Sequence, residues 1–225
     1  MLVIKAAHKP VRSSTRSKIG LAVAGGGPIG GIFEVGAMRA LDDAIEGLDM
    51  NALDVYVGIS SGAYIAASLA NRLTTTELCR IFVSNDSDQF KFKAEDFVRP
   101  AIWEYLRRLS GMPRLLLSGL AEFARHPFDL RVSDSLIKLG SILPTGLFDN
   151  EAIERFMRKA FTAHGRSNDF RELGRKLVIV AVELDSGQAI RFGTPGYDDV
   201  PISRAIEASS ALPGLYPPVL INGRY

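Results

Sequence analysis

Cysteine, histidine and tryptophan are scarce in this chain of 225 residues, and each shortage limits what the protein can do. The single cysteine, Cys79, cannot form a disulfide within the chain, which fits a reducing compartment. No cluster of His, Cys and Asp has the spacing of metal ligands, so we expect no metal and no other cofactor. Only three histidines could serve as general bases: His8, His126 and His164.

Long hydrophobic runs are also missing. The longest apolar patch, residues 115–123, is interrupted by Ser118, Gly119 and Glu122, and a membrane-spanning helix needs roughly 18 apolar residues. The net charge of +2 gives no sign of a nucleic-acid-binding protein. We therefore expect a cytoplasmic protein that can contact a membrane surface peripherally, and composition leaves its oligomeric state open.

Acidic residues are absent from the first 18 positions, which we interpret as a basic flexible tail. The segment lacks the apolar region of a secretory signal. It either contacts anionic lipid headgroups or is a solvated leader with no role. Its basic residues are Lys5, Lys9, Arg12, Arg16 and Lys18.

What is present predicts one α/β domain over residues 19–225 with a mainly parallel sheet flanked by helices. Short apolar runs at residues 19–24 and 55–58 predict buried strands, and each leads through a glycine-rich turn into a helical pattern. The run 176–184, "KLVIVAVEL", is the strongest strand signal, and Asp185-Ser186-Gly187 predicts a hairpin to "QAIRFG".

The remaining segments are mostly helical by pattern. Thr74–Thr76 before Glu77 predicts a helix start, and Asn150 is predicted to cap a helix that ends at Gly165. Residues 202–214 predict a short helix, and "YPPVLINGRY" is predicted to begin another strand. Residues 86–145 are irregular and rich in proline, and we interpret them as a helical insertion or lid.

The first glycine motif, Gly25-Gly26-Gly27-Pro28-Ile29-Gly30, lies between a predicted strand and a predicted helix. The pattern G-x-G-x-x-G can bind a dinucleotide, which requires an acidic residue at the end of the next strand. Asp49 and Asp54 are near the right distance but precede that strand. The alternative is an oxyanion hole, in which backbone amides and a helix N-terminus hold a small anion. Pro28 has no N–H, so the donors are Gly26, Gly27 or later amides.

The second motif, Gly58-Ile59-Ser60-Ser61-Gly62, has the form G-x-S-x-G. Glycines flank a nucleophilic serine in a tight strand-to-helix turn because larger side chains do not fit there. Ser60 is the candidate nucleophile, and the alternative is that it only caps the following helix. Neither His126 nor His164 directly follows a predicted strand, so the histidines are interpreted as structural and a different base must be considered.

Taken together, these segments resemble the patatin-like phospholipases over residues 19–225. The resemblance implies a three-layer α/β fold and a serine–aspartate dyad without histidine that hydrolyses acyl esters of lipids. By position, Ser60 is then the nucleophile, Gly25, Gly26, Gly27 and Gly30 belong to the oxyanion loop, and Gly58, Ser61 and Gly62 belong to the nucleophile turn. The segments that carry the resemblance are "AGGGPIGGIFEVGAMRAL", "GISSGAY", "VELDSGQAIRFG" and "ASSALPGLYPPVLINGRY".

The chain departs from the family pattern in three ways. Ile29 stands where the family usually carries Arg or Lys, and Ala24 stands where Asp is frequent. The dyad aspartate belongs to an Asp-Gly motif that the resemblance places shortly after Tyr225, so the domain is expected to be truncated before it. Asp185 matches a hairpin position of the family rather than the base. Two alternatives therefore remain: an inactive lipid-binding or scaffold module, and an acyltransferase or thioesterase that uses the same serine.

Overall fold

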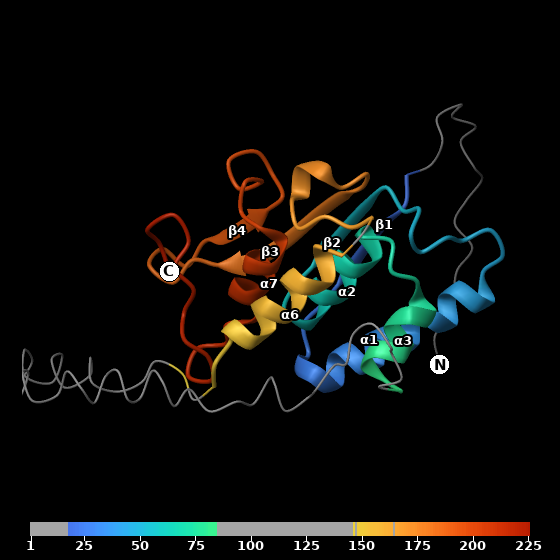
Figure 1. Ribbon diagram of the computed structural model, residues 1–225, viewed down its shortest axis with the longest axis horizontal. Helices are drawn as coiled ribbons and strands as arrows, with labels where there is room; N and C mark the ends of the chain where they lie inside the picture. Colours follow the sequence, from blue (N-terminus) through green and yellow to red (C-terminus); the bar gives the residue numbers. More distant parts are fainter. Residues whose placement is uncertain (1–17, 85–145, 147, 164) are drawn as a thin grey trace, which may run out of the picture.

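The computed structural model describes residues 18–84, 146, 148–163 and 165–225 (Figure 1). Four strands and five α-helices are defined in these ranges, with a short 3₁₀ helix before the third strand. In chain order they are β1 (Gly20–Val23), α1 (Gly27–Ala44), β2 (Val55–Gly58), α2 (Ser61–Ala70), α3 (Thr75–Phe82), α6 (Glu151–Phe161), η2 (Phe170–Glu172), β3 (Lys176–Val182), β4 (Ala189–Phe192) and α7 (Ile202–Ser210).

The described strands form one sheet in the order β1-β2-β3-β4. β1 and β3 both pair with β2 in parallel, so Val23, Gly58 and Ile179 lie side by side near one edge. β4 returns antiparallel to β3 through the turn at Gly187, whose φ is +69°. The predicted α/β class with a mainly parallel sheet is confirmed. Because parallel strands end at the same edge, the turns after β1 and β2 are neighbours.

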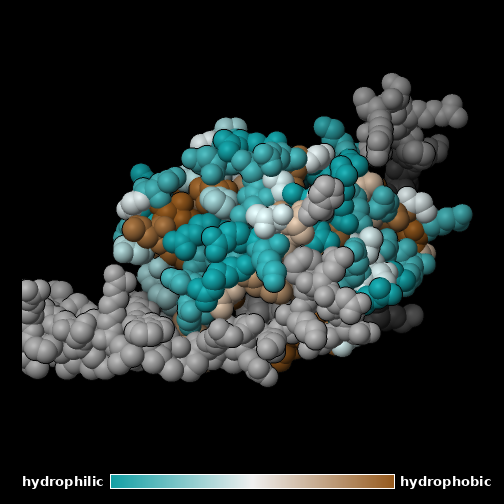
Figure 2. Space-filling model, in the orientation of Figure 1, coloured by the Kyte–Doolittle hydropathy of each residue, from teal (hydrophilic) through white to brown (hydrophobic). Residues whose placement is uncertain are grey.

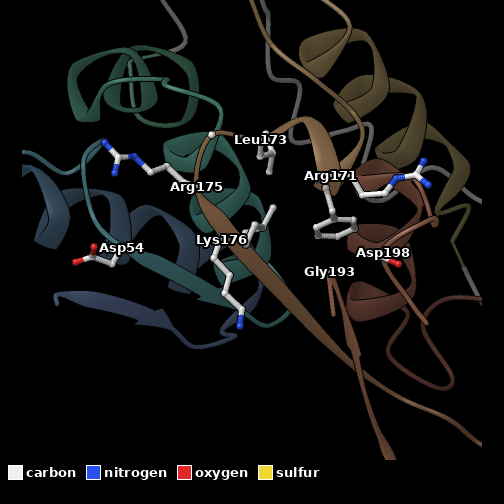
Figure 3. A pocket seen from close by; sticks show the side chains of 10 residues that line it. Asp54, Arg171, Leu173, Arg175, Lys176, Gly193 and Asp198 are labelled. Carbon is white, nitrogen blue, oxygen red and sulfur yellow. The ribbon is translucent and has the colours of Figure 1, made fainter. Parts of the chain in front are cut away.

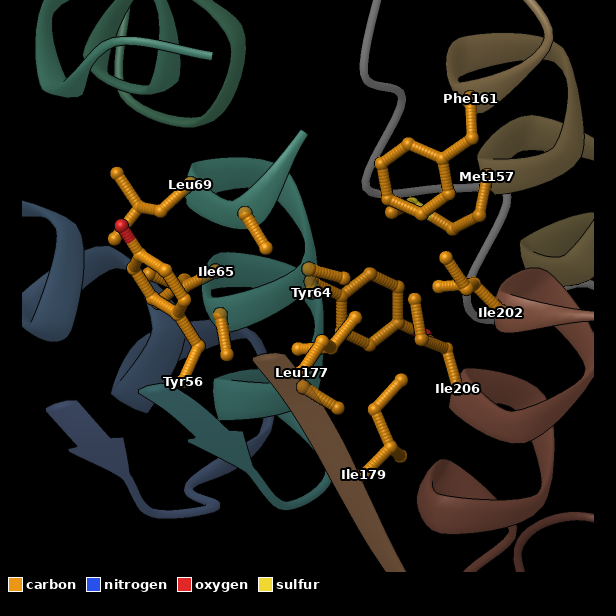
Figure 4. Close-up of a cluster of buried hydrophobic side chains, with 14 of the residues drawn as sticks. Tyr56, Tyr64, Ile65, Leu69, Met157, Phe161, Leu177, Ile179, Ile202 and Ile206 are labelled. Carbon is orange, nitrogen blue, oxygen red and sulfur yellow. The ribbon is translucent and has the colours of Figure 1, made fainter. Parts of the chain in front are cut away.

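The core lies between the sheet and the helices α2 and α7, and α6 packs on α7 from outside (Figures 1 and 4). Helix α2 is buried from Gly62 to Ala70, which explains its small apolar residues. Tyr56 is fully buried, and its hydroxyl is satisfied because it donates to Met50 O at 2.7 Å and accepts from Leu53 N at 3.1 Å. The burial of this central helix fixes the position of the turn that precedes it.

Local side-chain hydrogen bonds are found at the starts of α3 and α6, and the one at α6 corrects the sequence prediction. Thr74 and Glu77 form a reciprocal capping box at α3, as the pattern predicted. Asn150 precedes α6 but its side chain makes no capping bond and instead donates to Pro217 O at 3.1 Å. Asp149 supplies the local bond, accepting from Glu151 N at 2.8 Å. Helix α6 ends at Phe161 rather than at Gly165.

The C-terminal segment forms a turn where the sequence predicted a strand. Ile221 and Arg224 exchange backbone hydrogen bonds at 2.9 and 3.0 Å, with positive φ at Asn222 and Gly223. Asn-Gly is the pair that such two-residue hairpin turns favour. The turn is fixed to the end of β3, because Leu184 N donates to Tyr225 O at 2.8 Å.

Several predictions lie outside the described residues. These are the basic tail up to residue 17, the insertion at 86–145, and the roles of His126 and His164. Within the described ranges, no helix is both long and apolar enough to cross a membrane. On the face shown in Figure 2 the described surface is mostly hydrophilic, and hydrophobic residues gather near β4 and the C-terminal segment.

Candidate active site

Ser60 occupies the strained turn that joins β2 to α2. Its φ of 52° and ψ of −122° lie in a region that residues other than glycine rarely adopt. The Ser60 side chain makes no capping bond to α2, so the interpretation of Ser60 as a simple helix cap is not supported by the geometry. Strained conformations of this kind concentrate at functional sites.

The two glycines around Ser60 are required by close backbone contacts. A Cβ atom on Gly58 would lie 2.5 Å from Ala63 Cα, and one on Gly62 would lie 2.3 Å from Val23 O. Neither neighbour is a flexible side chain that could move aside. The G-x-S-x-G pattern therefore reflects packing of the turn against the start of α2 and the end of β1.

The glycine loop after β1 lies against the same turn. A Cβ on Gly25 would lie 3.0 Å from Ser60 Cβ, so glycine at this position permits the close approach. Gly27 has a φ of +61°, which glycine adopts without strain. Within the described ranges, nothing accepts a hydrogen bond from the amide of Gly26 or Gly27. These two N–H groups are available to an anion beside Ser60.

Gly30 does not fit the donor role that the motif suggested. Its N–H donates to Gly26 O at 3.0 Å, inside the first turn of α1, and Gly30 does not line the cavity at Ser60. Ile29, where the family pattern has a cation, is 83% exposed. The usable part of the loop is therefore Gly25 to Gly27.

A cavity of about 690 Å³ opens at Ser60. Ser60 and Ser61 line it together with Gly25, Gly26 and Gly27, and the first turns of α1 and α2 both face it. The positive ends of two helices favour a developing negative charge at this point. Most of the remaining lining is apolar: Ile32, Val35, Ile65, Phe82, Ile153, Val180, Ala181, Val182, Leu184, Leu212, Leu215 and Tyr216.

Tyr64 is a polar group in this apolar lining, one helical turn after Ser60. Its side chain is buried, and burial raises the pKa of its phenol well above the usual value. The phenol therefore stays neutral at physiological pH. Tyr64 adds no charge to the cavity.

The described residues that line the cavity at Ser60 include no Asp, Glu or His that could serve as its base. Asp185 lies in the exposed turn after β3 and does not line the cavity. Asp49 accepts from Asn51 N at 2.8 Å and Asp54 accepts from Ile19 N at 2.8 Å, and both precede β2. Their position at the opposite end of the strand removes the acidic partner that a dinucleotide site requires. No group of three or more His, Cys, Asp or Glu side chains that could hold a metal occurs within the described ranges.

A second cavity, of about 440 Å³, lies at the other end of the parallel strands (Figure 3). Its lining is charged, with Asp54, Arg175 and Lys176 near the strand starts and Arg171 to one side. Arg171 pairs with Asp169 at 2.6 Å, and this bond lowers the pKa of the Asp169 carboxyl to about 2. The described residues that line this cavity include no serine, threonine or cysteine and no non-glycine residue with a positive φ, so it is not the candidate active site.

One residue at the site carried no sequence prediction of a role. Ser209, in the last turn of α7, lines the cavity and accepts a hydrogen bond from Ser60 N at 2.8 Å. The pair Ser209-Ser210 was visible as part of the segment "ASSALPG", which contributed to the family resemblance. The pattern gave no indication that this helix end contacts the turn at Ser60.

The C-terminal segment lies close to this site. Leu184 lines the cavity at Ser60 and also a smaller cavity of about 320 Å³ that Arg224 and Tyr225 line. The buried Glu183 carboxylate accepts from Ser186 and from Arg224 Nη1, the latter at 3.1 Å, and these bonds lower its pKa. The chain at Tyr225 is thus fixed beside the wall of the candidate site.

Solved structures to which this chain is similar include the type III effector protein ExoU, with 20% sequence identity, 87% of this chain covered and a TM-score of 0.45. VipD from Legionella pneumophila shares 15% identity over 90% of this chain, with a TM-score of 0.42. A structure of full-length SpcU in complex with full-length ExoU, from the type III secretion system of Pseudomonas aeruginosa, shares 19% identity over 87%, with a TM-score of 0.44. The chain spans about two fifths of the length of these proteins, at 40%, 44% and 38%.

A search of curated proteins gave no match. The profile of one family, described as patatin-like phospholipase, matches residues 21–225. That range includes the glycine loop, the turn at Ser60, the β3–β4 hairpin and the C-terminal segment. The chain therefore belongs to the patatin-like phospholipase family, a family of lipid hydrolases.

Proposed function

We propose that this protein is a serine acyl hydrolase of lipid esters and that Ser60 is its nucleophile. The observation that carries the proposal is the position of Ser60, on a strained turn between two free loop amides and a largely apolar cavity. The cavity volume of about 690 Å³ falls within the range of roughly 300–1,000 Å³ typical of small-molecule sites. The apolar wall of the cavity can contact an acyl chain, and the part formed by Ser60 and the glycine loop can bind the ester group.

In the proposed reaction, Ser60 Oγ attacks the ester carbonyl carbon and its proton passes to a base. The carbonyl oxygen becomes an oxyanion, which the amides of Gly26 and Gly27 stabilise. Collapse of this intermediate expels the alcohol, which takes up the proton, and leaves an acyl-enzyme. The same base then takes a proton from water, which attacks the acyl-enzyme. The fatty acid is released, and the proton returns to Ser60 Oγ.

The base in this proposal is the aspartate that the family resemblance expects shortly after Tyr225. Its support is the docking of the C-terminal segment, because Tyr225 O accepts from Leu184 N and Leu184 lines the cavity at Ser60. A residue that closely follows Tyr225 would emerge beside this wall. The described residues that line the cavity include no Asp, Glu or His, and Asp185 is not among them.

The test measures fatty-acid release from phospholipid vesicles and from a short-chain ester. Three proteins are compared: residues 1–225, the chain extended through the Asp-Gly motif, and the extended chain with that aspartate changed to Asn. We expect turnover only in the extended chain, and its loss in a Ser60→Ala variant. Full activity of residues 1–225 would place the base within them and refute the assignment.

A lipid-binding module without catalysis is the second candidate, and the absence of a base for Ser60 among the described residues favours it. Vesicle binding without fatty-acid release, in the extended chain and in Ser60→Ala alike, would support that function.

Addition of alcohol acceptors to the same assay distinguishes hydrolysis from acyl transfer, because a transferase forms a new ester.

A further inference from the structure

Ser209 connects three segments that meet at the candidate active site. Its Oγ accepts from the backbone N–H of Ser60 at 2.8 Å and donates to Val180 O, in β3, at 2.6 Å. One side-chain hydroxyl thus joins the end of α7, the central strand and the turn that carries the nucleophile. Both hydrogen bonds are short and use the donor and the acceptor capacity of the hydroxyl.

The turn at Ser60 depends on such contacts because its backbone conformation is unfavourable. A non-glycine residue in this region of φ and ψ persists only where the surroundings determine it. The preceding amide, Ile59 N, is bonded to Val23 O at 3.2 Å, and this bond uses the backbone alone. The next amide, Ser60 N, is bonded to a side chain, so a single substitution can remove that contact.

We propose that Ser209 is a positioning residue for Ser60. Its hydroxyl fixes the peptide plane before Ser60 Cα and thereby aims the Ser60 Oγ into the cavity. It acts on acyl transfer only through Ser60, because its own hydroxyl is already engaged by Ser60 N and Val180 O. The inference rests on the proposed function for its chemical consequence, but the hydrogen bond itself can be tested without activity.

Ser203 provides a matched control on the same helix. Its Oγ is buried, accepts from Asn168 Nδ2 at 2.9 Å and donates to Glu154 Oε1 at 2.9 Å. Ser203→Ala therefore removes one accepted and one donated bond, as Ser209→Ala does, but at a distance from the turn. If both variants lose stability but only Ser209→Ala changes the reactivity of Ser60, the change is due to the contact with the turn.

The first measurement is the rate at which a short-chain fluorophosphonate labels Ser60 in the full-length protein. We expect the second-order rate constant to fall about 10- to 100-fold in Ser209→Ala, because small misplacements of a reacting atom are costly. It should stay at the wild-type value in Ser203→Ala, and Ser209→Thr, which keeps the hydroxyl, should restore most of it. With an ester substrate, kcat should fall in Ser209→Ala while KM is unchanged.

The second measurement is hydrogen exchange at the Ser60 amide, which requires no catalysis. Protection should be lost in Ser209→Ala and kept in Ser203→Ala. Unchanged exchange and unchanged labelling in a folded Ser209→Ala protein would overturn the inference, and so would equal slowing by Ser203→Ala. If wild-type Ser60 is not labelled at all, the proposed function fails, whereas the exchange result still decides whether Ser209 fixes the turn.

Discussion

The two ends of the parallel strands differ in backbone strain, in the space left for side chains and in the polarity of the adjoining cavity. At the carboxyl end, Ser60 has a strained backbone, Gly58 and Gly62 have no room for a side chain, and the adjoining cavity is mostly apolar. At the amino end, the cavity is lined by charges such as Lys176, and Asp54 is hydrogen-bonded to Ile19 N.

This difference indicates where ligand chemistry is concentrated in the fold. In open α/β sheets, ligands bind beyond the carboxyl ends of the strands, where helix N-termini and loops converge. At the amino end, Arg171 pairs with Asp169 and Asp54 accepts from Ile19 N, and none of the described non-glycine residues that line this cavity has a positive φ. Substitutions at the carboxyl end should therefore alter Ser60 chemistry, and those at the amino end should alter stability alone.

The largest expected effect comes from Gly62→Ala. Its Cβ would lie 2.3 Å from Val23 O and 2.4 Å from Ala24 O, so the β1–α2 contact must open. We expect the free energy of unfolding to fall by about 3 kcal/mol or more, the upper range for overpacking. Gly36→Ala is the control, because this helical glycine has open space and should gain about 0.5–1 kcal/mol. Denaturant unfolding measures both, and equal stability of the two variants would contradict the packing argument.

A smaller effect on stability but a large one on Ser60 labelling is expected from Gly27→Ala. Gly27 and Gly47 both have positive φ and open space, so each alanine variant should lose about 1–2 kcal/mol of stability. Only Gly27 lines the cavity with Ser60. Alanine keeps the backbone N–H, but relaxation of the backbone from the φ of +61° should move this donor, and we expect the labelling rate to fall roughly 10²-fold, as it does when an oxyanion donor is lost. If Gly47→Ala slows labelling equally, the glycine loop has no special role. Tight NAD binding to the wild type that Gly27→Ala abolishes would instead support a dinucleotide site.

Glu207 is a buried acid on α7, and its pH dependence distinguishes an effect on stability from an effect on Ser60 reactivity. Burial raises the pKa of its carboxyl to about 7, opposed by the Arg204 ion pair at 2.6 Å and assisted by Glu154 and Glu151. Between the unfolded value of 4.5 and this value, the folded state holds a proton that the unfolded chain releases. The stability that this proton contributes is present below pH 4.5 and is lost as the pH rises through 7.

The stability of the wild type relative to Glu207→Gln should therefore fall by about 2–3 kcal/mol from pH 5 to pH 8. Denaturant unfolding at four pH values measures this difference, and Glu46→Gln, at an exposed site after α1, is the control. Parallel curves for wild type and Glu207→Gln would contradict the prediction. A changed labelling rate would show that Glu207 acts at the site.

The smallest effect is expected at the amino end. Asp54→Ala removes the bond from Ile19 N and should lower the free energy of unfolding by about 1 kcal/mol. The labelling rate of Ser60 should be unchanged, because Asp54 lies at the other end of β2. A slower rate in this variant would weaken the contrast between the two ends.

Much of this arrangement was predictable because it depends on local patterns. Apolar runs closed by glycine predicted β1 and β2, and Asp185-Ser186-Gly187 predicted the hairpin between β3 and β4. The backbone demands at Gly58 and Gly62 were expected from the motif alone. In each case the residues that decide the structure are adjacent in the chain.

Other features depend on contacts between distant segments, which local patterns do not record. The bond from Ser60 N to Ser209 joins residues 149 positions apart, and Asn150 bonds to Pro217 instead of capping α6. Gly30 matched the glycine motif, yet its amide is used inside α1. The turn at Asn222-Gly223 is a different case, because the Asn-Gly pair that favours it is local. The apolar residues before this pair led to the prediction of a strand instead.

The most direct test of Ser60 as the nucleophile is to identify the residue to which a fluorophosphonate attaches in the protein. Peptide mapping by mass spectrometry identifies the modified serine, and Ser60→Ala and Ser61→Ala are treated in parallel. We predict one adduct, on Ser60, which persists in Ser61→Ala and disappears in Ser60→Ala. A stoichiometric adduct on Ser61 or on another serine would contradict the assignment of Ser60 as the nucleophile.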